Sequence, residues 1–147
     1  MLSVFDLFKI GIGPSSSHTV GPMLAGKAFA DELRGKGLLE NTARVQLDLY
    51  GSLAHTGDGH GTMGAVLSGL EGEEPHSAEP ARLAERIGAL KRNADLLLAG
   101  ERPVPFVYER DMLVHKGLFL PRHSNALTLT AADADGATLL TRTYYSI

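Results

Sequence analysis

Two short segments of this chain concentrate side chains that could do chemistry. The first, residues 13–22, reads GPSSSHTVGP and packs four hydroxyls and an imidazole between two Gly-Pro steps. These side chains belong to Ser15, Ser16, Ser17, His18 and Thr19. The apolar run Met23 to Leu33 follows, so the hydroxyls should lie at or just before a helix N-terminus, where free N–H groups and the helix dipole favour an anion. A helix cap needs only one hydroxyl. Four indicate a loop that binds a carboxylate or a phosphate.

The second segment, residues 51–62, reads GSLAHTGDGHGT and places glycines at alternate positions around Asp58 and His60. An alternating strand pattern precedes it, and helical spacing resumes at Met63. A glycine-rich loop between a strand and a helix lets the backbone approach a ligand closely and commonly holds an anion. The segment has neither the Lys-Ser/Thr ending of a P-loop nor GxGxxG spacing. On its pattern alone, this loop is the weaker of the two candidates.

Hydrophobic periodicity predicts the elements that position these loops. Residues 4–10 read as a short helix or strand. Three helices are predicted. The first covers residues 23–33 and is ended by Gly35 and Gly37, the second starts at Met63, and the third runs from about Pro80 to Leu98. Residues 43–50 alternate as a strand, Pro103 and Pro105 mark an edge or connector, and short strands are expected within 112–120. Residues 126–131 and 137–147 form a hairpin around the turn 133–136. The predicted fold class is α/β or α+β, a mixed sheet with helices packed on it.

Composition limits the remaining possibilities. The 147 residues suit one domain, and a net charge of −3 without a Lys/Arg cluster argues against nucleic acid as a partner. No stretch reaches transmembrane length, so no membrane association is expected. We expect a cytoplasmic protein. The absence of cysteine excludes disulfides, thiol nucleophiles and cysteine-bound clusters within the chain. The chain stops on a strand-like run, which is typical of a domain cut from a longer polypeptide.

Four stretches together resemble the β domain of bacterial iron-sulfur L-serine dehydratases, the L-serine ammonia-lyases. They are residues 13–23, residues 49–62, the segment 123–126 (HSNA) and the closing residues 144–147 (YYSI). The resemblance covers essentially the whole chain. The β domain of this family is in turn similar to the allosteric substrate-binding domain of certain D-3-phosphoglycerate dehydrogenases.

The resemblance implies a function. Members of the family convert L-serine to pyruvate and ammonia without pyridoxal phosphate. They use an oxygen-sensitive 4Fe-4S cluster held by cysteines of a separate α domain, which follows in the same chain or forms a second subunit. This chain would then be a single domain, residues 1–147, that helps to bind L-serine but is inactive alone and ligates no metal. A homo-oligomer is expected.

The resemblance also assigns roles to residues. The substrate-binding residues would be Ser15, Ser16, Ser17, Thr19, Gly59, Thr62 and Asn125. His18 and His60 are the candidates for proton transfer or for orienting substrate, because imidazole titrates near neutral pH. Which of the two is the base stays open.

The chain departs from the family pattern at three positions. Asp58 stands where a lysine is expected, Met63 where an acid is expected, and His55 where an apolar residue is expected. An acid beside a carboxylate substrate is unfavourable. Two other hypotheses stay open: a regulatory domain that senses serine or a related anion without catalysis, and a metallohydrolase that uses His55, Asp58 and His60.

Overall fold

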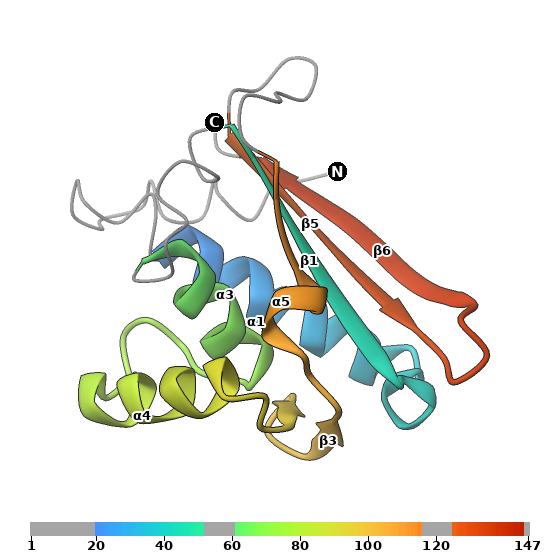
Figure 1. The fold of residues 1–147 in the computed structure, drawn as a ribbon, viewed down its shortest axis with the longest axis horizontal. Coiled ribbons are helices and arrows are strands. Elements are labelled where there is room, and N and C mark those ends of the chain that lie inside the picture. The colour runs from blue at the N-terminus through green and yellow to red at the C-terminus, as the bar shows by residue number, and fades with distance from the viewer. Residues whose placement is uncertain (1–19, 52–60, 116–124, 146–147) are drawn as a thin grey trace.

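The computed structural model describes residues 20–51, 61–115 and 125–145, which Figure 1 shows in colour. In chain order the elements are α1 (Val20–Gly35), the 3-10 helix η3 (Leu39–Asn41), β1 (Arg44–Gly51), α3 (Thr62–Leu70), α4 (Pro80–Lys91), β2 (Leu96–Leu98), β3 (Arg102–Val104), α5 (Tyr108–Asp111), β4 (Met112–His115), β5 (Asn125–Ala132) and β6 (Thr138–Tyr145). The sequence prediction for residues 4–10 lies outside the described residues.

The main sheet has the strand order β4-β1-β5-β6. Strands β1 and β4 are parallel, whereas β1–β5 and β5–β6 are antiparallel. Figure 1 shows the helices gathered on one side of this sheet, with the β5–β6 hairpin along its far edge. The predicted mixed sheet with a closing hairpin is therefore confirmed.

The core lies between the sheet and the helices α1 and α3. Alternate residues of β1, among them Leu47 and Leu49, are at most 1% exposed and face the helices, as the period of a half-buried strand requires. Phe29 of α1 and Leu70 of α3 are fully buried in the same cluster. Each such side chain contributes about 1.5–3 kcal/mol through burial, so this layer fixes the helices on the sheet.

Helices α1 and α3 pack with their backbones in close contact. A Cβ added at Gly26 would collide with the carbonyl oxygen of Val66, and one added at Gly69 would collide with that of Met23. Only glycine allows this approach, which brings the two helices together beneath the sheet (Figure 1).

The hairpin turn uses the chemistry that the sequence predicts. The Asp133 carboxylate accepts hydrogen bonds from the backbone N–H groups of Asp135 and Ala137, each at 2.9 Å. Gly136 has a φ of +88°, a conformation that side chains disfavour. The turn sets the register in which Thr128 lies opposite Thr143.

The predicted third helix was wrong beyond Lys91. The helix ends because Asn93 adopts a left-handed φ of 65°, with its N–H bonded to the Leu90 carbonyl and the Ala94 N–H bonded to the Ala89 carbonyl. The Asn93 side chain also accepts a hydrogen bond from the Tyr108 N–H at 3.0 Å. The remaining apolar residues form strand β2 instead.

Strand β2 pairs with β3, a short strand that contains Pro103. This agrees with the prediction of an edge or connector there, because proline lacks the N–H of a central strand. Strand β4 confirms the expected strand near Met112. The remainder of that prediction, residues 116–120, lies outside the described residues.

Candidate functional site

Of the nine residues predicted to act on substrate, Thr62 and Asn125 lie in the described part of the chain. Seven lie outside it and stay predictions: Ser15, Ser16, Ser17, His18, Thr19, Gly59 and His60. The described residues that flank the two predicted loops define the surroundings of the candidate site.

Both predicted loops lead directly into helices. Helix α1 begins at Val20, the residue after Thr19, and α3 begins at Thr62. Neither helix carries an acidic residue in its first turn, so no side chain of its own first turn neutralises the positive end of its dipole. Such a helix start is suited to an anion, and the prediction that these two segments bind one stays a prediction.

Strands β1 and β4 end, and strand β5 begins, at the same edge of the main sheet. In the register of the sheet, Gly51 lies opposite Asn125, and Tyr50 lies opposite both His115 and Ala126. The N-terminal ends of α1 and α3 lie on this same upper side of Figure 1. The carboxyl ends of the parallel strands β1 and β4 thus meet there, which is the usual place for a ligand in such sheets.

Thr62 and Met63 open helix α3 inside the core. Thr62 is fully buried, and Met63 is 5% exposed. The sulfur of Met63 accepts a hydrogen bond from the Tyr108 hydroxyl at 3.7 Å. The departure from the family pattern at Met63 therefore lies at a packed position. Asn125 is the first residue of β5, and its backbone is paired in register with Gly51.

A cluster that sequence reasoning missed lies at the same end of the sheet. Nε2 of His115 lies 2.8 Å from Oδ1 of Asp48, and the Gln46 amide donates to Oδ2 of Asp48 at 3.1 Å. The ring of Tyr50 stacks on His115, with centroids 4.5 Å apart and an interplanar angle of 7°. Burial, and then the charge of Asp48, raises the pKa of the Tyr50 phenol.

This cluster depends on the parallel pairing of β1 with β4. Asp48 and His115 are 67 residues apart in the chain. The alternation of residues 112–115 indicated a strand ending in His115, but it did not indicate which strand would lie beside it.

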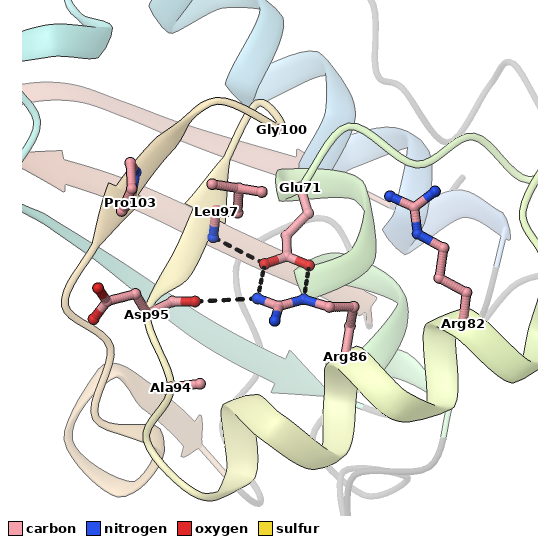
Figure 2. Close-up of a pocket in the computed structure, with 8 residues that line it drawn as sticks. All are labelled: Glu71, Arg82, Arg86, Ala94, Asp95, Leu97, Gly100 and Pro103. Carbon is pink, nitrogen blue, oxygen red and sulfur yellow. Dashed lines mark hydrogen bonds and ion pairs between the residues drawn. The ribbon is translucent and has the colours of Figure 1, made fainter.

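A pocket of about 430 Å³ lies between α4 and the β2–β3 ribbon, far below the upper end of the sheet in Figure 1. Figure 2 shows its two cations: Arg86 points at Glu71 and at the Asp95 carbonyl, while Arg82 lies apart from them. Arg82 pairs instead with Glu73 at 3.2 Å. Because both guanidinium groups already have carboxylate partners, this pocket is a structural junction.

The described residues contain no group of three or more His, Asp or Glu side chains placed to hold a metal ion. The metallohydrolase hypothesis rests on His55, Asp58 and His60, which lie outside those residues, and it stays a hypothesis. Within the same described part of the chain, no helix has the length and apolar character needed to span a membrane.

Comparison with known proteins gives one family model and relatives that carry the same name. Residues 3–147 match the family model described as the serine dehydratase beta chain. The chain is 51% identical to an L-serine dehydratase of Streptomyces coelicolor over 99% of its length, and 47% identical to L-serine dehydratase 1 of Escherichia coli over all of it. A similar protein of Helicobacter pylori, also named L-serine dehydratase, is 44% identical over 99% of the chain.

These relatives are longer proteins. The chain covers 32% of the Streptomyces and Escherichia proteins and 31% of the Helicobacter protein. It thus spans about a third of the length of the relatives that it matches.

Proposed function

The chain belongs to the serine dehydratase β-chain family, and from this membership we propose that it is the substrate-binding part of an L-serine dehydratase. The complete enzyme would convert L-serine to pyruvate and ammonia. The observation that carries the proposal is similarity along the whole chain to proteins that bear this name. The chain would act together with a further domain, because it matches only about a third of those proteins.

The end of the sheet supports this proposal. L-serine is a zwitterion, and its carboxylate suits the positive ends of α1 and α3, whose first turns carry no acidic residue. We assign carboxylate binding to the hydroxyls of Ser15, Ser16, Ser17 and Thr19, with contributions from Gly59, Thr62 and Asn125. His18 and His60 are proposed to transfer a proton or to orient the substrate.

The residues of this chain do not fit an iron-sulfur cluster. Such clusters are held by cysteine thiolates, and the chain has no cysteine. We therefore propose that a 4Fe-4S cluster is held by a cysteine-containing α domain or subunit, and that this chain contributes substrate binding. A cytoplasmic location and a homo-oligomeric assembly belong to the same proposal.

The test is anaerobic pyruvate release from L-serine. It compares this 147-residue chain with the complete protein encoded by its reading frame, loaded with iron and sulfide. Activity confined to the complete protein is the expected result. If the complete protein binds L-serine but releases no pyruvate, the chain is a serine-sensing domain and the dehydratase assignment is wrong.

A further inference from the structure

A groove of about 260 Å³ lies between α3 and α4, the two neighbouring helices at the left of Figure 1. Its floor is one face of α3, where small residues recur three and four positions apart: Gly61, Gly64, Ala65 and Ser68. Its wall is the face of α4 that carries Pro80, Leu83, Ala84 and Ile87. Met23 of α1 also lines the groove. A shallow helix face thus lies opposite an apolar one.

The floor of this groove is buried, whereas its α4 wall is not. Met23 is 3% exposed and Ala65 is 4% exposed. Leu83 and Ile87 are only half-buried, and Ala84 is exposed. The α3 residues that face this wall are too small to reach across and cover it. Apolar surface of this kind, left exposed in a groove, is typical of a contact with another part of an assembly.

Ser68 adds one polar group to the groove. The residue is 3% exposed, and its Oγ has no hydrogen-bond partner within the described part of the chain. A serine inside a helix often donates to the carbonyl four residues earlier, which this hydroxyl does not do. Because a buried hydroxyl without a partner is unfavourable, the floor favours a ligand that brings one polar group along with its apolar part.

The groove begins beside the candidate site. Gly61 directly precedes α3, and Met23 lies in the first turn of α1. The starts of these two helices are where substrate binding is proposed. The proposed function also requires a further domain at this site, since the chain matches only about a third of its relatives. A domain that reaches both helix starts borders the groove as well.

We propose that the groove between α3 and α4 is the docking site for the cysteine-containing α domain or subunit. That partner inserts an apolar side chain against Leu83 and Ile87 and brings a polar backbone group to Ser68. The inference rests on the proposed function and adds to it the surface by which the two parts assemble. Docking covers the exposed wall of α4, gives the buried hydroxyl a partner and fixes the further domain beside the starts of α1 and α3.

The first test maps what touches the groove in the complete protein. The photoreactive amino acid p-benzoylphenylalanine takes the place of Ala84, which is exposed on the groove wall. The matched control carries it in place of Ala81, which is exposed on the same helix but does not line the groove. After illumination, mass spectrometry should find position 84 joined to a peptide of the α domain. The control should give markedly less of this product.

The second test weakens docking with a charge. Ala84→Arg places a guanidinium in the groove, where a docked apolar side chain cannot solvate it. Hydrogen exchange of the α-domain peptide found by cross-linking should become about tenfold faster or more, because separating the two parts needs less free energy. Ala81→Arg should leave that exchange unchanged, and thermal unfolding verifies that both variants are folded. This readout lies outside residues 1–147, so a local distortion of α4 would not move it.

Several outcomes would overturn the inference. They are cross-linking of position 84 to a second copy of residues 1–147, equal cross-linking from positions 81 and 84, or wild-type exchange of the α domain in Ala84→Arg. A complete protein that cross-links as expected but releases no pyruvate contradicts the proposed function and leaves the docking site standing. Pyruvate release without a cross-link specific to position 84 has the opposite meaning.

Discussion

Asp111 carries a fully buried carboxylate that joins α5 to β1. It accepts hydrogen bonds from the Val107 N–H at 2.9 Å, from two nitrogens of Arg110 and from Nε of Arg44 at 2.8 Å. Burial alone would raise the pKa of this carboxyl. The donors outweigh burial, so its pKa lies below the ordinary value.

Asp111→Asn should lower the free energy of unfolding at pH 7 by about 2–4 kcal/mol, because donors to a buried charge lose their partner. The lowered pKa means that the ionised carboxyl stabilises the fold above its unfolded pKa of about 4, and that this contribution is lost as the pH falls through the folded pKa. Urea unfolding at pH 7 and near pH 3 measures the difference in the free energy of unfolding between wild type and Asp111→Asn. Asp31→Asn, at a half-exposed ion pair, is the control. A difference between wild type and Asp111→Asn that does not shrink in acid would contradict this account.

Single residues also show where prediction from sequence stops. The hydroxyls of residues 15–19 stood out by composition, and the start of α1 at Val20 confirms the helix expected after them. The Asp48–His115 pair did not stand out, because each residue alone is an ordinary polar side chain in a strand. Its chemistry arises from a parallel pairing between distant segments, which local periodicity does not encode.

At the scale of elements, the contact between α1 and α3 depends on glycine at the crossing. Gly26→Ala should destabilise the fold by about 2 kcal/mol or more, because a methyl group there meets backbone atoms that cannot move aside. Gly88→Ala in α4 is the matched control: its nearest neighbour is the flexible end of Arg92, 3.5 Å away. Alanine at that helical position should stabilise by about 0.5–1 kcal/mol. Thermal unfolding compares the two, and equal effects would show that α1 and α3 can separate without cost.

The elements predicted best were those with an unambiguous period and a matching terminator. Strand β1 alternates cleanly, and α1 ends where Gly37 adopts a φ of +69°. The third helix was overextended because the apolar run Leu96–Leu98 continues the helical pattern past Asn93. Asparagine is a weaker stop signal than glycine, and its partner, the Tyr108 N–H, is distant in sequence.

At the scale of the whole molecule, α4 is attached to the rest by few buried side chains, whereas the neighbouring strand β2 places Leu96 and Leu98 in the core. Leu90 is the only buried residue of α4. The Glu71 carboxylate, 7% exposed, accepts two hydrogen bonds from Arg86 at 2.9 and 2.7 Å and one from the Leu97 N–H at 2.8 Å. Figure 2 shows this one carboxylate joining the end of α3 to both α4 and β2.

Glu71→Gln should therefore loosen one part of the molecule and leave the main sheet intact. The amide can keep one of the Arg86 contacts but loses the charge that aligns the guanidinium, and the Leu97 N–H competes for its single oxygen. Hydrogen exchange of the backbone amides should become about tenfold faster or more in α4 and β2, because local opening needs less free energy there. Amides of β1 and β5 should exchange as in the wild type. Glu73→Gln, which removes the charge from the exposed Arg82 pair, should change neither region. Equal acceleration in the main sheet would mean that the molecule unfolds as one cooperative unit.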